Sequence, residues 1–586
     1  MNTRLISLTV WGWILLVTLP LTPMRLAAAP GTAQTGITRF DISLDGAVAG
    51  RVAAGRLFVF VSRRLDGEPR LFDASVYINN VPSSAEGAPL IFAKDLEDGS
   101  RAPFVLDGQA VGYPLESIKE IPPGDYAVQA VLAVYTKFTR SDGRTLWAHK
   151  DQGEGQDVLD APGNIVSETV RVHLDPHRGF AVPLRLSRAL PARAPLKDTD
   201  LIKHLHFRSA LASAFWGQDM EVGITVALPA SYASHPRQHY PLVLHQGHFG
   251  ESAVFSTLEP PVAAPGSARM KAWASSFGRF AADWNAGRTP QLIVVTLQHA
   301  TPYYDTSYFL NSPNTGPWGD VFVKEVIPYV EAHFRTIAEP HARVLGGLSS
   351  GGGISAYLQI QYPKLFGGAW IFAPDPLDFH DFYTINLYDN ANAYRAPGFA
   401  WDLAPPRCEF RTALGQCLQT MQNLIRYFDV LGTHGRSGQW LDNYDAMYGP
   451  LGADGYPVPV WNHRTGEIDR QVVAYWRDHG ADLHANLQSN WAQLAPDLID
   501  KLHFAAGDMD NYFLNQGLYR LQDFLTGPHA PDIGATFKFG RPMIGHTFIG
   551  VGYDPFPAAL LEDMAAHILK NTPPGRDISW NSDQVR

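Results

Sequence analysis

The chain has 586 residues, which is too long for one ordinary hydrophobic core and indicates two or three domains. Hydrophobic residues make up 45% of it and charged residues 18%, a composition typical of globular rather than disordered proteins. The formal net charge is −10 and no dense block of lysine and arginine occurs, which argues against nucleic acid as a partner.

The first 29 residues have the layout of a secretory signal peptide. Arg4 precedes an apolar run, and small residues follow that run at positions 27–29. Cleavage after Ala29 would leave Pro30 first, so cleavage near Ala33 is an alternative, and an uncleaved membrane anchor is the competing interpretation. We expect a secreted or periplasmic protein without stable membrane insertion after cleavage.

Residues 35–187 carry the alternation of β-strands. The runs at 55–64, 125–134 and 168–174 are strand candidates separated by turn clusters rich in proline and glycine. The pattern predicts an all-β, sandwich-like N-terminal domain, followed by a linker over 188–198. It contains no catalytic constellation, and a stabilising or carbohydrate-contacting role stays open.

Residues 199–586 change to short apolar runs separated by helical segments. The runs MEVGITVALP, PLVLHQG, QLIVVTLQ, RVLGG, AWIFA and KLHFAAG predict buried strands of a mostly parallel sheet in an α/β domain. Between about residues 379 and 495 the rhythm stops, and tryptophan, tyrosine, asparagine and glycine become frequent. This insertion is either a lid or substrate platform at the ligand-binding edge of the sheet, or a structural elaboration.

The chain has two cysteines, Cys408 and Cys417, both inside this insertion. In an exported protein, two cysteines nine residues apart are more typical of a disulfide than of a nucleophile. Neither cysteine stands in a redox or zinc motif.

A glycine-rich turn at residues 346–353, GGLSSGGG, points to nucleophilic chemistry. Ser349 alone satisfies G-x-S-x-G, with Gly347 and Gly351 on its two sides, between a strand and a helix candidate. In such a turn the serine is a nucleophile, and the N–H of Ser350 helps to bind the oxyanion. A phosphate-binding loop is the alternative, but the G-K-[ST] of that motif is missing.

A serine nucleophile requires a base and an acid, expected downstream in the order acid, then histidine. Asp508 and Asp510 follow the strand candidate KLHFAAG, and His546 follows the next one. His546 would accept the serine proton, and one of the two aspartates would orient its ring. Metal binding by the two aspartates has no further ligands in support.

From about residue 203 onward, the blocks GITVALPASY, YPLVLHQGH, WGDVFVKEVIPYVEAHFRTI, GGLSSGGG, YPKLFGG, GDMDNYFL and GHTF resemble the esterase D-like branch of the α/β-hydrolases. The resemblance implies an α/β-hydrolase fold and a triad of Ser349, Asp510 and His546. It places the second oxyanion N–H at His248, just after the strand ending in HQG. The long insertion departs from the blocks, so the resemblance leaves the substrate open.

Four further residues are predicted to line the substrate site: His245, Gln298, His299 and Trp440. Ordinary packing is the alternative for each of them. Asp375 and Asp378 are the fallback triad acids.

The sequence thus favours an exported serine ester hydrolase that acts on a small-molecule or polysaccharide-linked ester and needs neither a metal nor an organic cofactor. An acyltransferase using the same acyl-enzyme and a non-catalytic binding protein are the alternatives. The oligomeric state stays open.

Overall fold

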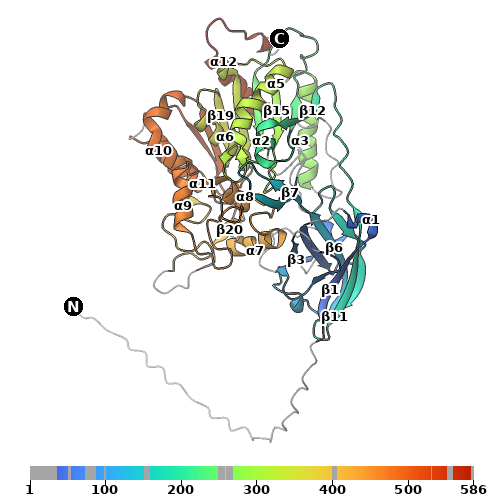
Figure 1. Ribbon diagram of the computed structural model, residues 1–586. Helices are drawn as coiled ribbons and strands as arrows, with labels where there is room; N and C mark the ends of the chain where they lie inside the picture. The colour runs from blue at the N-terminus through green and yellow to red at the C-terminus, as the bar shows by residue number, and fades with distance from the viewer. Residues whose placement is uncertain are drawn as a thin grey trace, which may run out of the picture.

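The computed structural model describes residues 36–50, 54–72, 88–97, 101–150, 159–247, 258, 268–398, 405–528, 531–550 and 558–581. The predicted signal peptide lies outside them. Figure 1 shows the N-terminal strands in blue and teal at the lower right, with the second sheet and its helices above them in green to red. Within the described ranges, no helix combines the length and the apolar character needed to cross a bilayer.

The N-terminal region is β-rich. Nine strands form one sheet, with all pairs antiparallel except β1 with β11. Their bounds in spatial order are β4 (Phe104–Leu106), β1 (Thr38–Leu44), β11 (Phe180–Ala189), β9 (Ile165–Ser167), β6 (Gly124–Val134), β2 (Gly55–Ser62), β3 (Leu90–Leu96) and β5 (Val111–Tyr113), with β10 (Val170–Leu174) paired to β6. The sandwich arrangement stays a prediction.

Strands β2 and β6 at the centre of this sheet are buried on both faces. Leu57 and Val59 of β2 pack into a core formed by the N-terminal region itself. Phe58 and Phe60, on the opposite face, belong to the hydrophobic core of the following α/β region. Because side chains alternate between the faces of a strand, this sheet joins two cores.

The second sheet has eight strands, of which the last six run parallel. Its order is β12 (Ile202–Ser209), β13 (Met220–Ala227), β15 (Ile293–Gln298), β14 (Leu242–Gln246), β18 (Arg343–Leu348), β19 (Gly368–Phe372), β22 (Leu502–Gly507) and β23 (Thr536–Gly540). β12 and β13 pair antiparallel, as do β13 and β15. This mostly parallel sheet, flanked by helices, has the α/β-hydrolase architecture that the sequence predicts.

The helices of this region are α2 (Ala210–Trp216), α3 (Ala268–Asn285), α4 (Trp318–Val321), α5 (Ile327–His333), α6 (Ser350–Gln361), α11 (Asn515–Thr526) and α12 (Ala558–Asn571). Helix α6 follows β18 directly and is buried along almost its whole length. It packs against β14, β18 and β19, and this burial explains why its sequence contains no charged residue.

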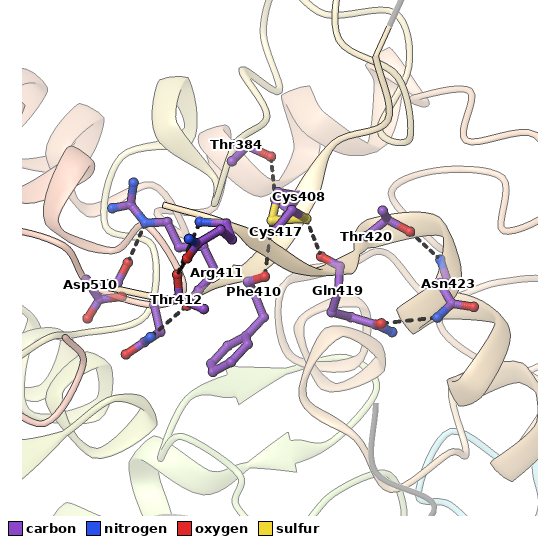
Figure 2. Close-up of a disulfide and its surroundings, with 12 residues drawn as sticks. Thr384, Cys408, Phe410, Arg411, Thr412, Cys417, Gln419, Thr420, Asn423 and Asp510 are labelled. Carbon is purple, nitrogen blue, oxygen red and sulfur yellow. Dashed lines mark hydrogen bonds between the residues drawn. A yellow bond between two sulfur atoms is a disulfide. The ribbon is translucent and has the colours of Figure 1, made fainter. Parts of the chain in front are cut away.

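Between β19 and β22 lies a helical insertion, at the left and centre of Figure 1 in yellow to orange. It contains a small hairpin of β20 (Cys408–Arg411) and β21 (Cys417–Thr420), then α7 (Met421–Leu431), α8 (Trp440–Tyr448), α9 (Arg470–Asp478) and α10 (Leu483–Leu494). A disulfide joins Cys408 to Cys417 across the hairpin, which confirms the predicted pairing (Figure 2).

The insertion also contacts the N-terminal region through a buried arginine. Arg56 of β2 is 1% exposed and donates hydrogen bonds to the carbonyl oxygens of Asp429 and Val430, at 2.7 and 3.0 Å. These carbonyls belong to the last turn of α7, where backbone acceptors lack partners within the helix. Arg56 also pairs with Asp95 at 2.7 Å, so its charge is balanced in the interior.

Candidate active site

Ser349 lies in a strained turn between β18 and α6. Its φ of 59° and ψ of −122° lie outside the regions that residues with a side chain usually adopt. The hydroxyl makes no capping bond to α6, although the residue stands at the cap position of that helix. The side chain is therefore not engaged in holding the turn, as expected for a serine whose oxygen is presented to a substrate.

Gly347 and Gly351 stand where neighbouring backbone leaves no room for a side chain. A Cβ atom on Gly347 would lie 2.5 Å from the backbone of Gly351, and one on Gly351 would lie 2.5 Å from the carbonyl oxygen of Gln246. Such approaches are impossible for a side chain without moving the backbone. The G-x-S-x-G spacing therefore permits the close packing of the turn against β14.

His546 and Asp510 form a hydrogen-bonded pair. The Nδ1 atom of His546 lies 2.8 Å from Oδ2 of Asp510, whose side chain is fully buried. The other oxygen of Asp510 accepts the backbone N–H groups of Tyr512 and Leu514, at 2.9 and 3.2 Å. This arrangement leaves the Nε2 atom of His546 as the ring nitrogen not bound to the carboxylate.

Asp508 binds backbone N–H groups and not the histidine ring. Its two carboxylate oxygens accept the backbone N–H groups of Met543 and Ile544, at 3.2 and 2.8 Å. Asp508 thus holds the loop that leads to His546, whereas Asp510 contacts the imidazole itself.

A second support for this loop comes from the insertion. The side-chain oxygen of Asn511 accepts the backbone N–H of His546 at 2.9 Å, and its Nδ2 donates to the carbonyl of Arg411 at 2.7 Å. Arg411 in turn donates from Nε to the carbonyl oxygen of Asp510 at 3.0 Å (Figure 2). The disulfide-closed hairpin therefore contacts both the acid and, through Asn511, the histidine.

The electrostatics of His546 suit a base. Burial opposes protonation of its imidazole, but the charge and hydrogen bond of Asp510 outweigh burial, so the pKa of His546 is raised above its ordinary value of 6.5. The carboxylate of Asp375 acts in the same direction.

A pocket opens beside Ser349. It is lined by Ser349, Ser350, Asp375, Tyr383, Trp440, Tyr512 and Leu514, and it is a small hollow open to solvent, with a cavity volume of about 20 Å³. The ring of Tyr512 also meets the His546 ring edge to face, with centroids 4.9 Å apart, so one residue of the pocket wall contacts the histidine. Tyr383 and Trp440 come from the insertion, which thus supplies part of the wall.

Of the two residues predicted to bind the oxyanion, the described residues include Ser350 but not His248. Ser350 is the first residue of α6 and lines the pocket. His248 lies outside the described residues. His245 lies within β14, aligned with Gly346 of β18, and burial lowers the pKa of its imidazole to about 4. It is not among the residues that line the pocket.

Gln298 and His299 serve the loop that follows β15. Gln298 donates to the carbonyl of Asp305 at 2.9 Å. The His299 ring stacks on Phe309 with centroids 3.7 Å apart, and its Nδ1 lies 2.8 Å from the Ser307 hydroxyl. Burial lowers the pKa of His299 to about 3, so it stays neutral. Of the four predicted substrate contacts, Trp440 is the one that lines the pocket.

The fallback acids have other partners. Asp378 bonds to His380 and His484, at 2.7 and 2.6 Å. Asp375 accepts a short hydrogen bond from the hydroxyl of Tyr308.

The sequence did not single out Tyr383, Tyr512, Asn511 or Arg411 for this site. The last three flank the predicted acid or the cysteines, and that proximity was the available signal. In the described part of the chain, no three histidine, cysteine, aspartate or glutamate side chains cluster in a manner that would hold a metal ion.

Comparison with known proteins supports an esterase. Residues 213–383, which include Ser349, match the family model described as "Putative esterase". No curated protein matches the chain significantly.

Several solved structures are similar in part. A ferulic acid esterase is 13% identical, with 63% of this chain and 98% of that chain covered and a TM-score of 0.31. The fluorophosphonate-binding serine hydrolase F of Staphylococcus aureus is 16% identical, with coverages of 63% and 98% and a TM-score of 0.33. An S-formylglutathione hydrolase from Agrobacterium tumefaciens is 13% identical, with coverages of 63% and 94% and a TM-score of 0.33.

The nucleophile-type turn, the hydrophobic parallel sheet and the family match agree with one another. Residues 213–383 match the esterase family model within a region of α/β-hydrolase architecture, and the chain is a carboxylic ester hydrolase.

Proposed function

We propose that the protein cleaves a carboxylic ester through an acyl-enzyme on Ser349. The Oγ of Ser349 attacks the ester carbonyl, and Nε2 of His546 takes the hydroxyl proton. The proton passes to the alkoxide oxygen as the ester C–O bond breaks, and the alcohol leaves. Water then attacks the acyl-enzyme, His546 takes one of its protons, and Ser349 is released with the carboxylic acid.

The other residues act on charge and orientation. Asp510 holds the His546 ring by its Nδ1 and stabilises the imidazolium that forms. The backbone N–H groups of Ser350 and His248 would stabilise the negative oxygen of the tetrahedral intermediate. The observation that carries the proposal is the 2.8 Å bond from His546 to a fully buried Asp510, beside a pocket lined by a strained serine.

The test is active-site labelling with a fluorophosphonate, read by mass spectrometry, together with hydrolysis of short-chain p-nitrophenyl esters. Wild type and Ser350→Ala are expected to carry the label on Ser349, and Ser349→Ala is expected to lose both label and turnover. Labelling elsewhere, or turnover in Ser349→Ala, would refute the assignment. Adding an acceptor alcohol separates hydrolysis from acyl transfer, because a transferase would yield a new ester.

We further propose that the protein is exported, with residues 1–29 removed, and that the β-rich N-terminal region is a sandwich-like module supporting the insertion. The disulfide between Cys408 and Cys417 supports export, because such bonds persist in oxidising compartments. Mass determination of the mature protein from a fractionated cell tests this, and an intact N-terminus in the cytoplasmic fraction would contradict it.

A further inference from the structure

We propose that the pocket beside Ser349 takes a positively charged group of the ester substrate, an alkylammonium held by the carboxylate of Asp375 and by aromatic walls. This inference rests on the proposed function and names the class of substrate for that site.

Asp375 is a buried acid whose charged neighbour is the imidazole of His546, which carries a positive charge only when it is protonated. Its side chain lines the pocket together with Ser349, and the residue is 6% exposed. Its carboxylate accepts hydrogen bonds from the hydroxyls of Tyr308 and Tyr444, and no ion pair with a lysine or arginine is found for it in the described part of the chain. An ionised carboxylate in such a place is costly unless a counter-charge arrives.

The position of Asp375 makes that counter-charge important for the reaction. The tetrahedral intermediate carries a negative oxygen, and a second negative charge in the same desolvated pocket would raise its energy. Burial raises the pKa of Asp375 to about 7, so a proton can neutralise it in the empty pocket. A substrate ammonium would replace that proton and leave an ion pair within the site.

A second buried acid lies behind the same wall. Glu409 of β20 is fully buried, and neither of its carboxylate oxygens has a hydrogen-bond partner among the described residues. Burial raises the pKa of Tyr383, a pocket residue, and negative charge on Asp375 or Glu409 would raise it further, which places both acids near that ring. Burial raises the pKa of Glu409 to about 8, so this carboxyl is protonated at neutral pH and leaves Asp375 as the acid that can carry charge in the pocket wall.

The rest of the lining suits an ammonium group. Tyr383, Trp440 and Tyr512 are aromatic, and aromatic faces attract cations, most strongly where water is excluded. The remaining apolar residue, Leu514, can contact a methylene chain. The lining contains no arginine or lysine that would repel the charge.

The test compares p-nitrophenyl esters whose acyl chains end in an ammonium, a methyl or a hydroxyl group at the same length. The β-alanyl, butyryl and 3-hydroxypropionyl esters form one set, and the 6-aminohexanoyl, heptanoyl and 6-hydroxyhexanoyl esters form a longer one. Wild type is expected to show a kcat/KM for the ammonium ester that is about tenfold or more above that of the methyl ester in at least one set, the factor that a charge-assisted contact gives.

Two variants and one control complete the design. Asp375→Asn, which keeps the shape, is expected to reduce the ammonium preference to below about threefold, whereas Glu409→Gln is expected to leave it unchanged at pH 7, where the Glu409 carboxyl is protonated. Asp445→Asn removes another buried acid that does not line the pocket and is expected to leave the ratio unchanged. Equal rates for the ammonium and methyl esters in wild type, a hydroxyl ester that is best, or an unchanged ratio in Asp375→Asn would overturn the inference. Fluorophosphonate labelling of Ser349 in the same preparations separates these outcomes from failure of the proposed function, which loss of labelling would signal.

Discussion

Replacing Asn511 by alanine removes two side-chain hydrogen bonds, one to the carbonyl of Arg411 and one from the backbone N–H of His546. Each such bond contributes about 1 kcal/mol to stability, so we expect the free energy of unfolding to fall by about 2 kcal/mol. The larger effect concerns His546, because a displacement of about 1 Å in a reacting group costs about 100-fold in rate. We therefore expect kcat to fall about 100-fold while KM changes little.

Urea unfolding and hydrolysis of a p-nitrophenyl ester measure the two effects separately. Thr384→Val is the matched control, because it removes a 2.9 Å hydrogen bond to the carbonyl of Cys408 on the same hairpin without touching the histidine loop. We expect it to cost about 1 kcal/mol in stability and to leave kcat unchanged. Asn511→Asp keeps the acceptor for His546 and should retain more activity than Asn511→Ala. A kcat of Asn511→Ala within threefold of wild type would show that the hairpin does not position the histidine.

Three further changes have defined outcomes. Gly347→Ala places a Cβ 2.5 Å from the opposite backbone and should abolish ester hydrolysis and fluorophosphonate labelling, whereas Gly353→Ala, with no neighbour closer than 3.4 Å, should preserve both. Asp375→Asn removes a carboxylate that, when ionised, raises the pKa of His546. The base must be unprotonated, so the acid limb of the kcat/KM profile should move to lower pH, by a small amount because Asp375 with its pKa of about 7 is itself partly protonated there; a shift to higher pH would contradict this. Burial raises the pKa of Glu409 from 4.5 to about 8, so its contribution to stability is complete below pH 4.5 and is lost as the pH rises to about 8. Glu409→Gln should therefore be more stable than wild type at pH 7 by up to about 3 kcal/mol, with no gain at pH 4, as chemical unfolding at both pH values would reveal.

Much of the sheet is readable from sequence because of how its strands are buried. The runs at β13, β14, β15, β18, β19 and β22 are short and predominantly apolar, as expected of strands covered on both faces. The turn at Ser349 is equally readable, since close backbone contacts on both sides admit only glycine.

The pocket is less readable because its walls come together only in three dimensions. Tyr383 and Trp440 stand in an insertion without regular periodicity, and nothing local distinguishes them from other aromatic residues there. His299 shows the opposite case: a polar residue after a strand suggests the ligand edge, yet stacking on Phe309 buries it in the loop. The link from Arg411 to Asn511 spans 100 positions and leaves no pattern in the chain.

The contact of Arg56 with the end of α7 determines how a truncation of the N-terminal region must be interpreted. A shortened chain that starts at β12 would keep every residue of the candidate active site. It would nevertheless lack Arg56, whose guanidinium donates hydrogen bonds to the last turn of α7. It would also expose to water the part of the α/β core that Phe58 and Phe60 cover. Since α7 follows directly on the disulfide hairpin, such damage would reach the His546 loop through neighbouring elements. Inactivity of the shortened chain would therefore not show that the N-terminal strands bind substrate. The N-terminal strands and the insertion have to be kept or removed together.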